Sequence, residues 1–124
     1  MNGRARLTGK RILVVEDDWF IANYVADALA GAGAAPVGPV ATAEGALDLL
    51  ERQGAPDAAT LDVTLLDGNS VPVARRLADM AVPFMFLTAD AGGALPPDLG
   101  DRPRLRKPFG GFQVVDALAG MLKG

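Results

Sequence analysis

The sequence contains neither cysteine nor histidine. The absence of cysteine excludes disulfide bonds, thiol chemistry and cysteine-ligated zinc. The absence of histidine excludes a Ser-His-Asp triad, imidazole metal ligands and a phosphohistidine on this chain. Any metal-binding or group-transfer chemistry must therefore use carboxylates, hydroxyls, amines or the backbone.

The chain also lacks long apolar runs and a strong net charge. Acidic residues interrupt its apolar stretches, so no segment is suited to span a bilayer and we expect no membrane association. Residues 1–10 are polar and basic rather than signal-like, which predicts a cytoplasmic protein. The net charge of −3 argues against nucleic acid as a direct partner.

The 124 residues provide for one domain with a sizeable core. We expect residues 1–9 to form a flexible N-terminal tail and residues 10–124 to form the domain. Short apolar runs alternate with helix-like segments, which is typical of a parallel sheet covered by helices on both faces. The predicted strands are residues 11–15, 35–40, 58–61, 84–87 and 104–106, of which the second contains two prolines and is predicted to lie at an edge.

Helices are predicted between most of these strands. The first spans 19–30, Thr42 and Ser70 are the predicted N-caps of the second and third, and the last runs through residues 112–122. We expect Trp19 to be partly buried and Phe109, Phe112 and Val115 to lie in the core. Residues 89–103 are too rich in glycine and proline for a full helix, so at most a turn or two is expected near residues 98–99.

These elements predict an α/β fold with a doubly wound, five-stranded parallel sheet of flavodoxin-like strand order 2-1-3-4-5. The fourth crossover helix is expected to be short or missing. In such a sheet, ligands bind at the carboxyl ends of the strands.

Polar residues follow the predicted strands at that edge. Glu16 and Asp17 follow the first strand, Asp62 the third, Thr88 the fourth and Lys107 the fifth. Two carboxylates about 4 Å apart repel each other by about 4 kcal/mol at moderate dielectric, and Mg²⁺ is the hard cation that best relieves this repulsion. A carboxylate there can attack phosphorus to form an aspartyl phosphate, with an ammonium and a hydroxyl supplying counter-charge.

Four motifs in this order resemble the receiver domains of two-component response regulators, from about residue 10 to the end of the chain. They are ILVVEDD at positions 12–18, LDVTLLDG at 61–68, FLTAD at 86–90 and KPF at 107–109. The segment 71–90 resembles a branch of single-domain regulators, common in alphaproteobacteria, that carry a Phe-x-Phe-x-Thr motif.

The resemblance implies that Asp62 is the phosphoacceptor. It also implies that Glu16 and Asp17 hold Mg²⁺, with Asp17 the more direct ligand, and that the backbone carbonyl of Thr64 completes the metal site. Asp62, as the acceptor, would share that metal.

The resemblance further implies that Thr88 is the switch hydroxyl and that Lys107 pairs with the phosphoryl group across a cis Lys107-Pro108 bond. The implied partners are a sensor histidine kinase or a phosphotransfer protein, and a target protein.

Several positions depart from the family pattern. Arg104 occupies the position of an aromatic residue that usually couples to the switch hydroxyl, and Leu66 and Ser70 stand where proline and glycine are usual. The crossover after Thr88 is also short. We therefore expect a read-out surface that differs from the usual one, and Asp90 is either a solvated loop acid or a group that tunes the phosphoryl lifetime.

The sequence leaves three functional hypotheses. The first is a signalling switch, not an enzyme beyond its own phosphorylation and dephosphorylation, that acts by protein–protein contact. The second is a haloacid-dehalogenase-like phosphohydrolase, which Thr64 disfavours because that position would carry a second aspartate. The third is a degenerate receiver that serves as a scaffold without phosphorylation. The apolar residues of the last helix suit either core packing or a dimer interface.

Overall fold

The computed structural model describes residues 6–89 and 95–123. Within these residues, five strands form an all-parallel sheet in the order β2-β1-β3-β6-β7, which confirms the predicted topology. The strands are β1 (Arg11–Val15), β2 (Ala35–Val40), β3 (Ala58–Asp62), β6 (Phe84–Thr88) and β7 (Arg104–Arg106). The proline-containing β2 lies at one edge, as predicted.

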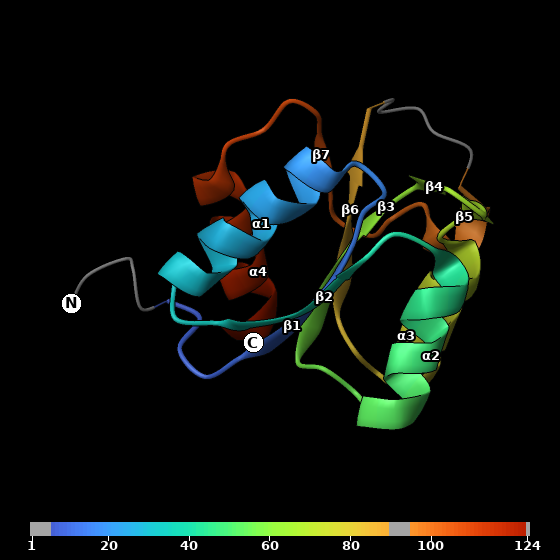
Figure 1. Cartoon of the computed structure of the whole chain (residues 1–124), viewed down its shortest axis with the longest axis horizontal. Coiled ribbons are helices and arrows are strands. Elements are labelled where there is room, and N and C mark those ends of the chain that lie inside the picture. Colours follow the sequence, from blue (N-terminus) through green and yellow to red (C-terminus); the bar gives the residue numbers. More distant parts are fainter. Residues whose placement is uncertain (1–5, 90–94, 124) are drawn as a thin grey trace.

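Helices cover both faces of the sheet (Figure 1). Helices α1 (Trp19–Gly31) and α4 (Gly111–Lys123) pack together on one face, and α2 (Ala43–Gln53) and α3 (Val71–Asp79) pack on the other. In the described part of the crossover between β6 and β7, the regular element is one short 3₁₀ turn, η2 (Pro97–Leu99). This agrees with the expectation that the fourth crossover helix is short or missing.

Two apolar clusters, one on each side of the sheet, form the core. Every residue of β3 and β6 is buried, because these central strands have neighbours on both sides and helices on both faces. Leu13, Leu61 and Phe86 belong to the cluster beneath α2 and α3, whereas Ile12 and Leu87 belong to the cluster beneath α1 and α4. The strand ends that carry the polar residues are thereby held on a rigid base.

Of the two predicted N-caps, one makes a capping hydrogen bond. Thr42 is the N-cap of α2 and accepts a hydrogen bond from the Gly45 amide. Asp18 caps α1 by accepting from the Phe20 and Ile21 amides. Ser70 occupies the N-cap position of α3, but its buried hydroxyl makes no capping bond, so this part of the prediction is wrong.

A small antiparallel hairpin after Asp62 was not predicted. It consists of β4 (Thr64–Leu65) and β5 (Gly68–Asn69). Strands of two residues are too short to show a hydrophobic alternation, so the sequence pattern could not predict them. Gly68, with φ of +135°, provides the backbone conformation that closes the turn.

The folded part of the chain begins before residue 10. Leu7 is only 1% exposed and its amide donates to the Ala32 carbonyl, while Arg6 forms an ion pair with Asp116. Residues 6–9 therefore pack against α1 and α4 instead of forming part of a free tail. Residues 1–5 of the expected tail lie outside the described part.

Two aromatic residues expected to be at least partly buried are exposed. Trp19 is 77% exposed and Phe112 is 74% exposed, so both predictions are wrong. Each lies in the first turn of its helix, which follows directly from the carboxyl end of a strand. The sheet stops at that level, so these side chains have little to pack against.

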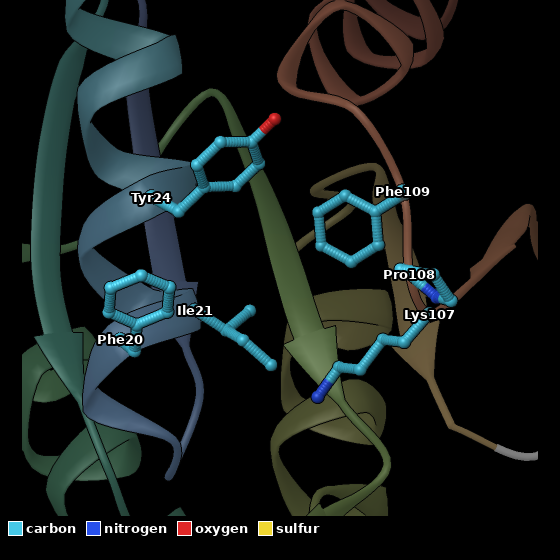
Figure 2. A pocket seen from close by; sticks show the side chains of 6 residues that line it. All are labelled: Phe20, Ile21, Tyr24, Lys107, Pro108 and Phe109. Atoms are coloured by element: carbon cyan, nitrogen blue, oxygen red, sulfur yellow. The ribbon is translucent and has the colours of Figure 1, made fainter.

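A pocket of about 460 Å³ opens beside these helix starts (Figure 2). Phe20, Ile21 and Tyr24 line it from α1, and Lys107, Pro108 and Phe109 line it from the segment after β7. The Tyr24 hydroxyl accepts a hydrogen bond from the Gly111 amide and so joins α1 to the start of α4. The pocket thus continues from Lys107 along an apolar wall.

We predict that the core and the surface respond differently to the same truncation. Leu13→Ala removes a fully buried side chain from β1 and should lower the free energy of unfolding by about 2–5 kcal/mol. Leu66→Ala truncates an exposed leucine and should change it by less than about 0.5 kcal/mol. Urea unfolding of both variants checks this, and equal losses would contradict the assigned core.

Candidate functional site

Four polar side chains from three strand ends meet at the carboxyl edge of the sheet. Glu16 and Asp17 follow β1, Asp62 ends β3, and Lys107 follows β7. Because β1 pairs with β3 in parallel, the ends of both strands lie at the same level. The structure therefore brings together these residues, which the sequence pattern had placed at one edge.

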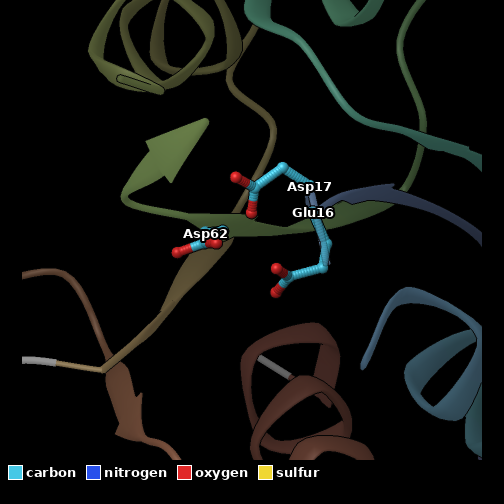
Figure 3. A group of neighbouring side chains, drawn as sticks. All are labelled: Glu16, Asp17 and Asp62. Atoms are coloured by element: carbon cyan, nitrogen blue, oxygen red, sulfur yellow. The ribbon is translucent and has the colours of Figure 1, made fainter. Parts of the chain in front are cut away.

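The carboxylates of Glu16, Asp17 and Asp62 form a tight group (Figure 3). One oxygen from each residue lies within 4.8 Å of the others. Glu16 is 2% exposed and Asp62 is 7% exposed, while Asp17 is half-buried. Carboxylates held this close and this dry repel one another strongly.

The crowding changes the acidity of these groups. Burial raises the pKa of Glu16 to about 7, and the neighbouring Asp62 adds to the increase. Burial and the proximity of Asp62 likewise raise the pKa of Asp17. Both carboxyl groups therefore hold their protons more tightly than free side chains do.

Lys107 supplies positive charge to the group. Its Nζ atom lies 2.9 Å from Glu16 Oε1 and 3.3 Å from Asp62 Oδ2. Burial by itself would lower the pKa of Lys107, but the ion pairs with Glu16 and Asp62 outweigh burial and raise it. The ammonium therefore stays charged, and the Lys107-Pro108 bond that follows is cis, as the resemblance implies.

Thr88 ends β6 at the same edge and is buried. Its carbonyl accepts a hydrogen bond from the Lys107 amide at 2.8 Å, so the backbone of the two residues is joined. Thr64 lies in β4, two residues after Asp62, and its amide nitrogen lies 3.4 Å from Asp62 Oδ1. Asp18, the third acid of the run, caps α1, as its place before the helix suggests.

The residues present fit a divalent metal ion. The Lys107 ammonium is a single positive charge beside three carboxylates, of which it pairs with Glu16 and Asp62. An all-oxygen donor set that is short of positive charge suits Mg²⁺. The group can therefore accept a hard cation without rearrangement of its strands.

Arg104 makes a polar contact that the aromatic residue usual at this position could not make. Its guanidinium donates to the Gly100 carbonyl at 3.0 Å, and the guanidinium of Arg102 lies 4.4 Å above the Phe84 ring. Both contacts tie the crossover after η2 to the edge of the sheet. Asp90 lies outside the described residues.

Sequence reasoning missed one residue near the site. Asp67, in the turn between β4 and β5, accepts hydrogen bonds from the Ala43 and Glu44 amides at the start of α2. An aspartate before glycine is a common turn signal, but the pattern does not reveal a partner more than 20 residues away.

In the part of the chain that the structure describes, the helices are too short or too polar to cross a membrane. A comparison with protein-family models finds no match, and a comparison with curated proteins finds none either.

The fold and sequence do match solved structures. SdrG from Sphingomonas melonis Fr1 is 43% identical, with a TM-score of 0.78, and the match covers 94% of this chain and 98% of SdrG. A BeF3-activated conformation of SdrG, from Pseudomonas melonis Fr1, is 41% identical, with a TM-score of 0.75, and the match covers 93% of this chain and 98% of that one. The receiver domain of the PhyR response regulator from Erythrobacter litoralis is 25% identical, with a TM-score of 0.82 and coverage of 94% and 92%.

These matches extend over nearly the whole length of both chains, and the sheet order and the motifs at the strand ends agree with them. The chain therefore belongs to the receiver domains of response regulators.

Proposed function

We propose that this domain is a phosphorylation switch in which Asp62 accepts a phosphoryl group with the help of Mg²⁺. The donor is a sensor histidine kinase or a phosphotransfer protein, and the phosphorylated domain acts by contact with a target protein. The observation that carries the proposal is the group of carboxylates from Glu16, Asp17 and Asp62, with Lys107 paired to the first and the last of them.

The proposed metal site uses oxygen donors that follow β1, end β3 and begin β4. The carboxylates of Glu16, Asp17 and Asp62 and the backbone carbonyl of Thr64 would hold Mg²⁺. When bound, the ion supplies positive charge that offsets the carboxylates and the incoming phosphoryl oxygens. Asp17 is the more accessible of the first two acids, which suits the more direct ligand.

Asp62 provides the nucleophilic oxygen. A carboxylate oxygen of Asp62 forms a bond to phosphorus while the bond from phosphorus to the donor's histidine nitrogen breaks, and the nitrogen keeps the electron pair. Asp62 is 7% exposed, so a donor must approach along the edge of the sheet. No acid or base on this chain needs to transfer a proton in this step.

Lys107 and Thr88 stabilise the phosphorylated form. Lys107 Nζ already lies 3.3 Å from Asp62 Oδ2, so its ammonium is placed to pair with a phosphoryl oxygen. Thr88 ends the strand next to β3, and its hydroxyl is the proposed switch group. SdrG has a BeF3-activated conformation, and BeF3⁻ bound to a carboxylate oxygen is tetrahedral, as a phosphoryl group on that oxygen is.

The apolar pocket beside Lys107 supports a protein donor (Figure 2). Its wall on α1 exposes Phe20 and Tyr24 to solvent a short way from the acceptor site. A contiguous apolar surface next to a reactive group is typical of a protein-binding face. We infer that the phosphodonor protein rests here while its histidine reaches Asp62.

A scaffold without phosphorylation is the second candidate, because Arg104 contacts the crossover where an aromatic switch residue is usual. The phosphohydrolase hypothesis has weaker support, since Thr64 has no carboxylate and the similar proteins are receiver domains. Cytoplasmic location and dimer formation stay predictions.

We predict that the protein gains one phosphoryl group when it is incubated with Mg²⁺ and a small acyl phosphate. The gain should be absent in Asp62→Asn, which lacks the nucleophilic carboxylate, and in wild type treated with EDTA beforehand. Intact-mass measurement checks all three samples. A wild type that gains nothing from any donor would favour the scaffold hypothesis.

We predict that Mg²⁺ binds more tightly as the pH rises, because a proton on Glu16 competes with the metal. With the pKa of Glu16 near 7 and that of Asp17 also raised, the affinity should increase up to a pH just above 7 and then level off. Trp19, the sole tryptophan, lines a cavity with Glu16 and Asp17, so its fluorescence can report Mg²⁺ binding.

The same groups set a pH dependence of stability in the absence of metal. Folding raises the pKa of Glu16 from 4.5 to about 7. The contribution of Glu16 to the free energy of unfolding is therefore fully present below pH 4.5 and is lost as the pH rises through about 7. Glu16→Gln should weaken Mg²⁺ binding and flatten both profiles. An Mg²⁺ affinity that is constant across this range in wild type would contradict the assignment of Glu16.

We predict that Phe20→Ala slows phosphoryl transfer from a protein donor by about ten-fold, as truncation of a central interface residue does. The rate with a small acyl phosphate should stay within about two-fold of wild type, because Phe20 does not touch the carboxylate group. Glu51→Ala, an exposed change on α2, is the control. The test uses any phosphorylated kinase or phosphotransfer protein that labels the wild type, and equal slowing with both donor types would rule out a docking role.

A further inference from the structure

The hairpin that follows Asp62 is bound to the start of α2 by one carboxylate. Asp67 Oδ1 accepts from the Ala43 amide at 2.9 Å, and Asp67 Oδ2 accepts from the Glu44 amide at 3.1 Å. The hairpin and the start of α2 lie beside each other in the fold (Figure 1). Both oxygens of one side chain thus join two segments that are far apart in the sequence.

The start of α2 receives its hydrogen-bond acceptors from two sources. Thr42 Oγ1 accepts from the Gly45 amide at 2.9 Å, which is an ordinary local cap. The two preceding amides have no acceptor within the helix and bind Asp67 instead. These bonds lower the pKa of Asp67, so the carboxylate is ionised at neutral pH and complements the positive end of the helix.

The hairpin carries a residue of the proposed metal site. Thr64 pairs with Asn69 and Leu65 with Gly68 across the hairpin, and Leu65 is buried. At the base of the hairpin, the Ser70 amide donates to the Val63 carbonyl. Core packing and backbone bonds therefore hold the base, and Asp67 holds the tip.

The segment before α2 is bound to the other half of the site. The Glu16 amide donates to the Val40 carbonyl at 2.9 Å, and Val40 ends β2 just before α2 begins. Asp67 thereby completes a closed set of contacts that runs from Glu16 through Val40 and the start of α2 to the hairpin and Asp62. Without Asp67, the hairpin would keep its base but lose this link.

We propose that Asp67 is a positioning residue, which holds the Thr64 carbonyl and Asp62 in place against Glu16 and Asp17 for Mg²⁺ binding and phosphorylation. The inference rests on the proposed function, since it concerns the same metal and acceptor site. Asp67 itself touches neither the metal group nor the acceptor and acts through the hairpin.

The test compares Asp67→Ala with Thr42→Ala, because both variants remove capping bonds from α2 but only the first releases the hairpin. Trp19 fluorescence measures the Mg²⁺ affinity, and incubation with a small acyl phosphate measures the phosphorylation rate. Urea unfolding measures the stability. Asp67→Ala should weaken Mg²⁺ binding by about ten-fold or more, as loss of residues that orient metal ligands does. Thr42→Ala should stay within about two-fold of wild type, and Asp67→Asn, which keeps one acceptor oxygen, should lie between.

Unchanged Mg²⁺ affinity in Asp67→Ala, or equal weakening in Thr42→Ala, would overturn the inference and leave Asp67 as a helix cap alone. If Asp67→Ala does not fold, the comparison of Asp67→Asn with Thr42→Ala decides in the same way. A wild type that binds no Mg²⁺ and gains no phosphoryl group would overturn the proposed function together with the inference, so the two failures are distinguishable.

Discussion

The site of this domain depends on three carboxylates that the fold holds together at the carboxyl edge of its parallel sheet. Glu16, Asp17 and Asp62 share that edge because β1 and β3 are parallel neighbours whose ends lie at one level. Burial and mutual repulsion raise the pKa of Glu16 and Asp17, and Lys107 offsets part of the charge. The remaining excess of negative charge is what makes the site suited to a cation.

The surroundings of this edge serve to hold it. β7 pairs with β6 and so brings Lys107 beside the carboxylates, and the Thr88 carbonyl holds the Lys107 amide. On the opposite side, Asp67 and Val40 link the hairpin and β2 to the same edge. The site is thus supported by backbone hydrogen bonds and capping bonds, which are short and directional, together with the packing of the buried strands beneath it.

The crossover between β6 and β7 differs in construction from the helical crossovers of the sheet. The crossover between β6 and β7 has a single 3₁₀ turn in its described part, and arginines tie it to the sheet: Arg104 to the Gly100 carbonyl and Arg102 to the Phe84 ring. Leu99 of the 3₁₀ turn is buried in the apolar cluster beneath α2 and α3, so the described part of the crossover is also joined to the core. The chain is nevertheless 43% identical to SdrG over 94% of its length and belongs among the receiver domains.

The sequence by itself determined the five strands of the parallel sheet, the edge position of β2, the reduced crossover in its described part and the set of polar residues at the strand ends. These follow from local periodicity and from the rule that parallel strands end together. Only the tertiary structure decided the burial of Leu7, the exposure of Trp19 and Phe112, the hairpin after Asp62 and the contact of Asp67 with α2. Each of these features depends on which segment, far away in the sequence, lies close by in the fold. A local pattern of apolar and polar residues carries no information about such contacts.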